Sequence, residues 1–453
     1  MKNLMTSVSG VRGIVGDSMT PETVVKYVHA FAQPLKGKKI VVGGDPRISQ
    51  FFIRPLVKSV LMASGCQVVD IGITPTPTVQ IAVEKLAAAG GIAITASHNP
   101  IQWNGLKFIG GDGLFLPEKK ITELFRRAEK PGRVYANWKE LGSEESYGSA
   151  IEDHLQAIYD LSYIDVDLIR SKKFKVALDC VNGAGGVIIP KLLEHLGCEI
   201  VGLNLEPTGM FAHTPEPVPQ NLGDLCRAVK ESQADLGFAV DPDVDRCAII
   251  GNDGNPLGEE YTLALTVKFI LMKKPGHVVI NLSTSRAIDD LVLYYNCILT
   301  KTKVGEINVA DKMREVGAVI GGEGNGGVIL PDIHLGRDAP AAVALTLQHL
   351  AEGGKSINEL KQTLPQYYIL KDKSSLGEVN PDVVMEHFAN KYRGEQLDFS
   401  DGLRIDRSDS WIHLRKSNTE PIMRIIVEAR TPEIAWRILQ EAKDEIARLD
   451  RRT

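Results

Sequence analysis

Short apolar runs alternate with amphipathic stretches along most of the chain. The runs at 39–43, 67–71 and 91–94 predict buried strands, and the stretches between them carry apolar residues at helical spacing. A first helix is predicted after Thr20, because a capping hydroxyl followed by Pro21 is typical of a helix N-terminus. This alternation of strand and helix predicts a mostly parallel sheet.

The same alternation recurs twice. Further strands are predicted at 174–179, 198–203 and 236–240, and then at 278–282, 298–302 and 318–320. Three αβ blocks of about 100 residues therefore follow one another, each of a common domain size. In each block one strand leads into a polar loop, which indicates a repeat of architecture and not of sequence; these loops are 95–100, 241–246 and 321–327.

The last part of the chain has a different pattern. Strand-like segments at 411–415 and 423–429 precede a helix that begins near Pro432 and carries apolar residues on one face. This predicts a smaller α+β domain with a helix packed on an antiparallel sheet. No low-complexity linker separates the blocks, so we expect domains that pack directly on one another, with the boundaries 1–148, 149–253, 254–365 and 366–453.

Composition narrows the class of protein. Of 453 residues, 43% are hydrophobic and 24% charged, as in ordinary globular proteins. The net charge of -5 gives no basic footprint for nucleic acid. The six cysteines are scattered without a C-x-x-C pair, no apolar run approaches the ~18 residues of a membrane span, and no signal-peptide core occurs. We expect a cytoplasmic protein that binds neither nucleic acid nor membrane, as a monomer or a homodimer.

Ser97 lies in the polar loop after the strand at 91–94. Open α/β sheets place ligand chemistry at the carboxyl ends of their strands, so the Ser97 hydroxyl is a candidate nucleophile with His98 beside it. The alternative is a turn in which the Ser97 hydroxyl only closes the loop. Pro100 prevents this segment from continuing as regular structure.

Asp241, Asp243 and Asp245 alternate in the loop of the second block. Three carboxylates within five residues repel one another unless a cation neutralises them, and oxygen ligands suit Mg²⁺. A solvated acidic turn is the alternative. Arg246, which follows directly, is a candidate substrate contact.

The glycine-rich loop of the third block contains Glu323 and Asn325. Its spacing is not that of a P-loop, and no lysine follows. Glycines around one carboxylate and one amide suit recognition of sugar hydroxyls, because the backbone can approach the ligand closely. A flexible turn is the equal alternative.

The hairpin in the C-terminal block concentrates cationic and small donor side chains, which suit a phosphate dianion. A solvated basic hairpin is the alternative, and without interleaved aromatic residues a nucleic-acid patch is disfavoured. The candidate phosphate-binding residues are Arg415, Ser417, Asn418, Thr419 and Arg424. Together the four loops predict phosphoryl transfer on a phosphorylated polyol.

With these four motifs in order over the whole chain, the sequence resembles the α-D-phosphohexomutase superfamily of phosphoglucomutases, phosphomannomutases and phosphoglucosamine mutases. The resemblance implies four domains in a heart-shaped arrangement, and a phosphoserine at Ser97. It further implies Mg²⁺ held by the three aspartates and the Ser97 phosphate, and a hexose 1,6-bisphosphate that primes the enzyme. Arg12 and Lys107 match basic residues that flank the phosphoserine. Glycine is more usual in the family at the positions of Pro242 and Val244.

Departures from the family pattern bear on the substrate. Asn325 and Gly327 replace a serine and a histidine of the sugar loop. Glu306 stands where several phosphomannomutases have a histidine or an aromatic residue, and an acidic group there can pair with a sugar ammonium. The competing interpretation is that Glu306 only favours the start of a helix. The Glu-Gly-Asn-Gly-Gly form and the segment 334–338 resemble the phosphoglucosamine mutase branch.

The reaction implied by the resemblance interconverts hexosamine 6-phosphate and 1-phosphate through a bound 1,6-bisphosphate, with Lys107 or His98 relaying the hydroxyl proton. Phosphomannomutase or phosphoglucomutase activity is the nearest alternative. A non-catalytic sugar-phosphate-binding protein would have no use for both Ser97 and the aspartates. A serine hydrolase is disfavoured, because Ser97 lacks the Gly-x-Ser-x-Gly elbow.

Overall fold

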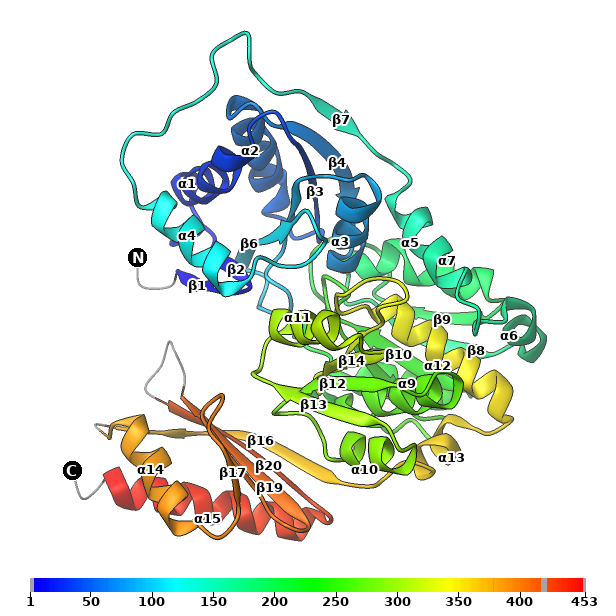
Figure 1. Cartoon of the computed structure of the whole chain (residues 1–453). Coiled ribbons are helices and arrows are strands. Elements are labelled where there is room, and N and C mark those ends of the chain that lie inside the picture. The colour runs from blue at the N-terminus through cyan, green and yellow to red at the C-terminus, as the bar shows by residue number, and fades with distance from the viewer. Residues whose placement is uncertain (1–3, 378, 417–421, 451–453) are drawn as a thin grey trace.

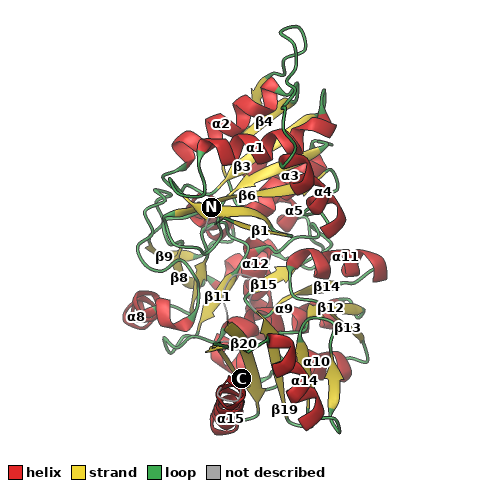
Figure 2. Ribbon diagram, turned by 90° about the vertical axis from the view of Figure 1, so that its left-hand side faces the viewer, coloured by secondary structure: helices red, strands yellow, loops and turns green. Residues whose placement is uncertain are grey.

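Within residues 4–377, 379–416 and 422–450, which the computed structural model describes, the strands form four separate sheets. The domains built on them follow the chain from one end of the molecule to the other, with the N-terminal domain and the C-terminal domain at opposite ends (Figures 1 and 2). This confirms the prediction of three αβ domains and a smaller C-terminal α+β domain.

The N-terminal domain has a mixed sheet with the strand order β1-β2-β6-β5-β3-β4-β7. Apolar residues on successive positions of its central strands alternate between two cores, one on each face of the sheet. The predicted cap is present, since Thr20 Oγ1 accepts a hydrogen bond from Thr23 N. The elements are β1 (Met5–Ser7), β2 (Gly10–Ile14), α1 (Pro21–Ala32), β3 (Lys39–Gly44), α2 (Gln50–Ala63), β4 (Gln67–Ile73), α3 (Thr76–Lys85), β5 (Gly90–Ile94), β6 (Trp103–Gly110), α4 (Glu118–Ala128) and β7 (Glu144–Ser146).

The second domain has a four-stranded sheet in the order β11-β10-β8-β9, in which only β11 runs antiparallel. Its elements are α5 (Ala150–Tyr159), α6 (Val166–Lys172), β8 (Lys175–Asp179), α7 (Ile189–His195), β9 (Glu199–Leu203), α8 (Gly223–Ser232), β10 (Leu236–Val240) and β11 (Cys247–Ile250).

The third domain repeats this plan in the order β13-β12-β14-β15, with β15 antiparallel. One strand differs from its prediction: it spans Ile320–Glu323 instead of 318–320, so the glycine-rich stretch is part of a hairpin and not a free loop. The elements are α9 (Glu259–Lys273), β12 (His277–Asn281), α10 (Ala287–Tyr294), β13 (Ile298–Thr302), α11 (Glu306–Val316), β14 (Ile320–Glu323), β15 (Gly327–Ile329), α12 (Ala339–Gly353) and α13 (Ile357–Gln362).

The three polar loops hold equivalent positions in these sheets. The orders β6-β5-β3-β4, β11-β10-β8-β9 and β15-β14-β12-β13 match strand for strand. In each case the polar loop joins a parallel strand (β5, β10 or β14) to its antiparallel neighbour (β6, β11 or β15). The predicted repeat of architecture is therefore present, and it places three chemically different loops at the same point of three sheets.

The C-terminal domain has a fully antiparallel sheet in the order β16-β20-β19-β18-β17, with its own apolar core beneath the last helix. Its elements are β16 (Tyr368–Ser375), α14 (Pro381–Lys391), β17 (Gln396–Asp398), β18 (Leu403–Asp406), β19 (Ser410–Lys416), β20 (Ile422–Ala429) and α15 (Pro432–Asp450).

The αβ domains pack directly on one another, as the absence of linkers indicated. One continuous apolar core joins the second and third domains, and Ile307 and Ala310 of α11 pack into a core of the N-terminal domain. Burial of these side chains fixes how the three polar loops meet.

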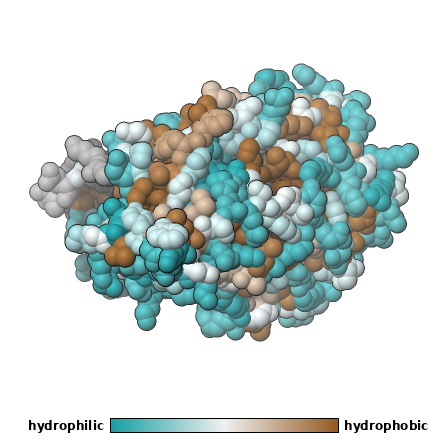
Figure 3. Space-filling view, turned by 90° about the horizontal axis from the view of Figure 1, so that it is seen from above, coloured by the Kyte–Doolittle hydropathy of each residue, from teal (hydrophilic) through white to brown (hydrophobic). Residues whose placement is uncertain are grey.

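The outer surface mixes hydrophilic and hydrophobic side chains. Seen from above, brown apolar patches are divided by teal polar residues (Figure 3), as is common on protein surfaces. Among the described residues, no helix is both long and apolar enough to cross a bilayer.

Candidate active site

Ser97 lies where β5 ends, and its side chain faces the second domain. The residue is 1% exposed, and its Oγ donates a hydrogen bond to Asp241 Oδ2 at 3.0 Å. His98 Nδ1 lies 3.3 Å from the same oxygen. Ser97 has a φ of +50°, in the left-handed region that costs a non-glycine residue energy. The backbone is thus held in a conformation that directs the hydroxyl at the acidic loop.

The three predicted metal ligands converge after β10. Asp241, Asp243 and Asp245 are all fully buried, and one oxygen from each lies within 4.8 Å of the others. Val244 between them has a φ of +63°, which explains why glycine is more usual at this position in the family.

The carboxylate oxygens of this loop divide into bonded and free atoms. Asp241 Oδ1 accepts the backbone N–H groups of Asp245 and Arg246, which fixes the loop. Asp243 Oδ1 and Asp245 Oδ1 are buried, and neither has a hydrogen-bond partner. Buried carboxylate oxygens without partners are costly, and a hard divalent cation would satisfy them.

The crowding of negative charge among the three aspartates also indicates a cation site. Burial and the neighbouring carboxylates of Asp245 and Asp243 raise the pKa of Asp241 well above its usual value. A divalent cation would relieve this repulsion, so the donor set fits Mg²⁺.

Lys107 links the N-terminal domain to the acidic loop. Its Nζ donates to Asp243 Oδ2 at 2.6 Å and to Asp245 Oδ2 at 3.2 Å. Burial by itself lowers the pKa of Lys107, but attraction by the two aspartates outweighs it and raises the pKa above the usual value. Lys107 is therefore held as a cation.

Arg12 contacts the Ser97 loop, and His98 is part of it. Arg12 Nη1 donates to Asn99 Oδ1 at 3.1 Å, and the β2–β6 register sets Arg12 opposite Gly105, two residues before Lys107 on β6. Repulsion by Arg246, together with burial, lowers the pKa of His98 well below its usual value. His98 is accordingly a neutral imidazole at pH 7.

Arg337 is the central cation of the site, and sequence reasoning gave it no role. Its Nη2 donates to Asp245 Oδ2 at 2.6 Å, and its Nη1 to Glu323 Oε2 at 2.9 Å. Its Nε and its backbone N donate to Glu306 at 2.9 and 3.3 Å. Arg337 therefore joins the metal loop, the sugar loop and helix α11. Its only sequence signal was its place inside the segment 334–338.

Glu306 differs from the expectation of a carboxylate free to meet a sugar ammonium. Both of its oxygens accept hydrogen bonds from Arg337, and it is the first residue of α11, as the competing interpretation held. A buried arginine therefore pairs with this carboxylate, and a contact between Glu306 and a sugar ammonium stays a prediction.

The other two sugar-loop residues lie at the β14–β15 turn. Glu323 is 4% exposed and accepts hydrogen bonds from Asn281, Gly305 and Arg337. Asn325 is partly exposed, and its Oδ1 accepts from Gly327 N. A β-carbon on Gly327 would lie 2.3 Å from Arg337 Cδ, so the residue that replaces a family histidine makes room for Arg337.

Arg246 closes one side of the site. Its Nη1 lies 3.4 Å from Glu216 Oε1, and its buried Nε has no hydrogen-bond partner. Glu216 also approaches His98 Nε2, at 3.8 Å. Glu216 is a further residue that sequence reasoning missed, and it gives no motif signal.

Arg47 is another missed residue, and it holds the Ser97 loop in place. The side chain is fully buried, and its guanidinium donates to the carbonyl oxygens of Ser97, Asn99 and Pro100. It also forms an ion pair with Asp45. The sequence feature that could have indicated Arg47 is its position shortly after β3, in the polar segment that follows a buried strand.

The predicted phosphate clamp lies apart from this site, in the C-terminal domain. Arg415 on β19 and Arg424 on β20 are directly opposite one another in the antiparallel register. Like charges in that position repel one another, and although Arg415 pairs with Asp401 at 3.0 Å, two opposed guanidiniums suit a phosphate. Ser417, Asn418 and Thr419 lie outside the described residues.

Comparison with known proteins matches all four domains to one family. The matches are the phosphoglucomutase/phosphomannomutase alpha/beta/alpha domains I, II and III at residues 4–133, 152–254 and 258–368, and the C-terminal domain at 369–445.

Individual relatives cover almost the whole chain. A probable phosphoglucosamine mutase of Methanopyrus kandleri is 37% identical over 98% of this chain and 97% of its own length. A phosphoglucomutase/phosphomannomutase of Thermococcus kodakarensis is also 37% identical, over 95% of this chain and 96% of its own.

Solved structures share the fold. A phosphoglucomutase/phosphomannomutase family protein of Burkholderia thailandensis superposes with a TM-score of 0.85 at 27% identity, covering 99% of this chain and 98% of that one. An N-acetylphosphoglucosamine mutase of Aspergillus fumigatus, solved with GlcNAc-6P and magnesium, gives a TM-score of 0.63 at 14% identity, over 98% and 96% of the two chains.

Proposed function

Since this chain belongs to the phosphoglucomutase/phosphomannomutase family of phosphohexomutases, we propose that it interconverts glucosamine 6-phosphate and glucosamine 1-phosphate through a phosphoserine at Ser97. The observation that carries the proposal is the contact between Ser97 Oγ and Asp241, with Lys107 bound to Asp243 and Asp245 beside it. A hydroxyl, three carboxylates and a held cation meet there from two domains.

In the proposed reaction a free hydroxyl oxygen of the sugar attacks the phosphorus of phospho-Ser97. The bond from phosphorus to Ser97 Oγ breaks, and the hydroxyl proton passes to a base. This yields a sugar 1,6-bisphosphate and an unmodified serine. After the bisphosphate has turned, Ser97 Oγ attacks its other phosphate, which restores phospho-Ser97 and releases the isomeric monophosphate.

The residues around Ser97 have different roles in this reaction. Arg12 and Lys107 place positive charge beside the transferred group, where negative charge accumulates. His98, whose Nδ1 lies 3.3 Å from Ser97 Oγ, is a neutral imidazole able to accept a proton. Mg²⁺, held by Asp241, Asp243, Asp245 and the Ser97 phosphate, would supply further charge stabilisation when bound. A hexose 1,6-bisphosphate would load the serine.

Recognition is assigned to two other domains. Glu323 and Asn325 at the β14–β15 turn, together with Arg246 of the second domain, are assigned to contacts with sugar hydroxyls. Arg415 and Arg424 would hold whichever phosphate is not reacting. A clamp on a separate domain suits this reaction, because the same clamp must accept two different ends of the sugar.

The choice of glucosamine rests on the names of relatives, including the Methanopyrus kandleri protein, and on the glycine-rich form of the sugar loop. The Thermococcus kodakarensis relative of equal identity carries the other name of the family, so phosphomannomutase or phosphoglucomutase activity is the second candidate.

The test is a comparison of kcat/KM for glucosamine, glucose, mannose and N-acetylglucosamine 6-phosphates, each with its own 1,6-bisphosphate and Mg²⁺. We expect glucosamine 6-phosphate to have the highest value. A higher value for glucose or mannose would establish the second candidate. No turnover of any of the four would contradict the assignment as a mutase.

A further inference from the structure

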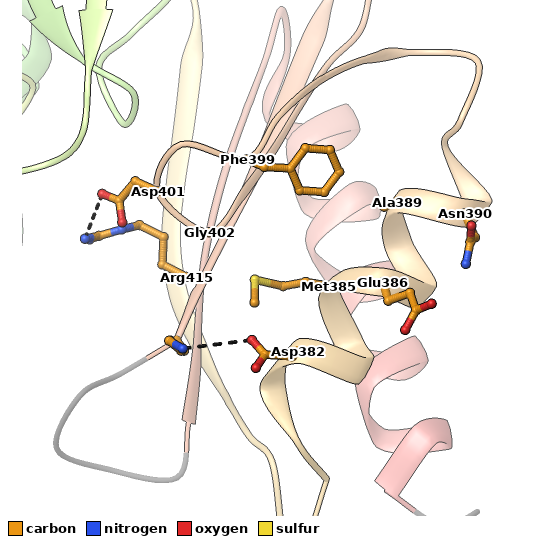
Figure 4. A pocket seen from close by; sticks show the side chains of 10 residues that line it. Asp382, Met385, Glu386, Ala389, Asn390, Phe399, Asp401, Gly402 and Arg415 are labelled. Atoms are coloured by element: carbon orange, nitrogen blue, oxygen red, sulfur yellow. Dashed lines mark ion pairs between the residues drawn. The ribbon is translucent and has the colours of Figure 1, made fainter.

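Asp401 connects the phosphate clamp of the C-terminal domain to the third domain. It lies in the turn before β18, next to Arg415 on β19 (Figure 4). One oxygen, Oδ2, has two partners, one through an ion pair and one through a hydrogen bond. Arg415 Nη2 lies 3.0 Å from it, and the backbone N–H of Val304 donates to it at 2.9 Å. Val304 belongs to the third domain and precedes the start of α11 by two residues.

The main chain of Asp401 is fixed separately. His413 Nε2 lies 2.7 Å from the Asp401 carbonyl oxygen, and His413 Nδ1 lies 3.0 Å from Ser283 Oγ of the third domain. Because a carbonyl oxygen only accepts, Nε2 carries the proton and Nδ1 accepts from the serine. Burial lowers the pKa of His413 to about 4, so this neutral tautomer persists at pH 7.

The Arg415 side chain is partly exposed beside a cavity. Its Nε is buried and has no hydrogen-bond partner, while Nη2 is bound to Asp401. The side chain borders a cavity of about 590 Å³, which is also lined by Asp382, Met385 and Phe399 (Figure 4). A phosphate bound to the partly exposed Arg415 side chain would compete with Asp401 for the same guanidinium.

The contacts continue from Val304 into the active site. Gly305 N, the next backbone N–H group, donates to Glu323 Oε1 at 2.9 Å, and Glu323 Oε2 accepts from Arg337. Arg337 in turn binds Asp245 of the metal loop. The clamp and the metal loop are thus joined through an unbroken series of polar contacts and one peptide unit.

We propose that Asp401 is a positioning residue that couples phosphate occupancy of the clamp to the Val304–Gly305 segment, and through it to the sugar loop. This rests on the proposed function, because it assigns the clamp to a sugar phosphate. Without an anion, Asp401 Oδ2 is shared between its ion pair with Arg415 and its hydrogen bond from Val304. An anion on Arg415 weakens the first bond and leaves the carboxylate to Val304, whose N–H is then held more tightly.

Amide hydrogen exchange of the peptide containing Val304 and Gly305 tests this with inorganic phosphate as the probe. In the wild-type protein, saturating phosphate should slow exchange of these amides several-fold. In Asp401→Asn it should leave the rate unchanged, because the neutral side chain no longer responds to the guanidinium. Asp382→Asn is the matched control: it lines the same cavity, but its contact with Lys416 is 3.9 Å long and exposed, and it should behave as wild type.

The kinetic arm uses whichever sugar phosphate the wild type turns over. Asp401→Asn should raise KM about tenfold and also lower kcat, because both clamp and sugar loop lose their alignment, whereas Asp382→Asn should stay within twofold. Thermal unfolding confirms that each variant is folded.

The proposal is overturned if phosphate fails to slow exchange in the wild type, or slows it equally in Asp401→Asn. It is also overturned if Asp401→Asn matches Asp382→Asn in both kinetic constants. Absence of turnover in the wild type would contradict the proposed function alone, since the exchange measurement needs no substrate and still decides on Asp401.

Discussion

At the scale of single residues, the site is organised by buried charges that neutralise one another across domains. Arg337 contacts Asp245, Glu306 and Glu323, which are 92, 31 and 14 positions away in the chain. Removing one partner of such a buried group leaves uncompensated charge, which costs about 3–5 kcal/mol. Each member therefore affects both stability and activity.

Glu306→Gln tests whether this carboxylate acts through Arg337. A glutamine would set an amide N–H₂ against the guanidinium and shift Arg337 away from Asp245 and Glu323. We expect kcat/KM for glucosamine phosphate and for glucose phosphate to fall by similar factors, about tenfold or more. A loss confined to glucosamine phosphate would show instead that Glu306 meets the sugar ammonium.

Asp243→Asn tests the metal site. The substitution keeps the size of the side chain but removes a charge, so binding of Mn²⁺, followed by its electron paramagnetic signal as a probe for Mg²⁺, should weaken by at least about 100-fold. Turnover with Mg²⁺ should fall in parallel. The exposed Asp253, in the turn after β11, provides the control Asp253→Asn. Unchanged Mn²⁺ affinity in Asp243→Asn would contradict the assignment of this ligand.

The site residues that could be predicted from the sequence are those marked by their own local pattern. Ser97 and the three aspartates each follow an apolar run, so pattern and residue type together indicated their positions. Arg337, Arg47 and Glu216 were missed, because their roles arise from contacts between distant segments and no spacing encodes those contacts.

At the scale of elements, the recurring unit is a parallel strand followed by a polar loop and an antiparallel strand. The parallel strands β3, β4, β8, β9, β10, β12 and β13 were all predicted within one or two residues. Their antiparallel neighbours β6, β11 and β15 were not. β15 has only three residues, which is too short to show an alternation of apolar and polar side chains. The preceding β14 begins with Ile320 followed by two glycines, so it does not show one either.

Asp406 on β18 tests an ion pair with Arg404 of the same strand, to which Arg286 of the third domain adds a contact. Its Oδ1 accepts from Arg286 Nη2 at 3.0 Å, and Arg404 Nε donates to its Oδ2 at 2.8 Å. Burial raises the pKa of Asp406, but the hydrogen bonds and charge of Arg404 lower it to about 2. A folded-state pKa below the unfolded value means that the contact stabilises the protein above about pH 4, by roughly 2 kcal/mol, and that this is lost as pH falls towards 2.

Asp406→Asn should therefore lower Tm at pH 7, and the difference from wild type should narrow as the pH is reduced from about 4 to 2. Calorimetric scans at a series of pH values measure this. A Tm difference independent of pH would show that Asp406 contributes through packing and not through its charge.

At the scale of the whole molecule, the division of labour follows from the arrangement of domains. The three αβ domains share packed cores, which fixes the Ser97, aspartate and sugar loops relative to one another. The C-terminal domain has a core of its own and contacts the third domain through polar groups such as Arg286 and Asp406. The clamp is thus carried by a separately packed unit beside a fixed catalytic centre.

The central claim is that Ser97 carries the phosphoryl group. Intact-mass spectrometry after incubation with a hexose 1,6-bisphosphate and Mg²⁺, followed by removal of the sugar, measures it most directly. The account predicts a gain of about 80 Da in the wild type, lost again when sugar monophosphate is added, and no gain in Ser97→Ala. An equal gain in Ser97→Ala, or none in a wild-type protein that turns over sugar phosphate, would contradict it.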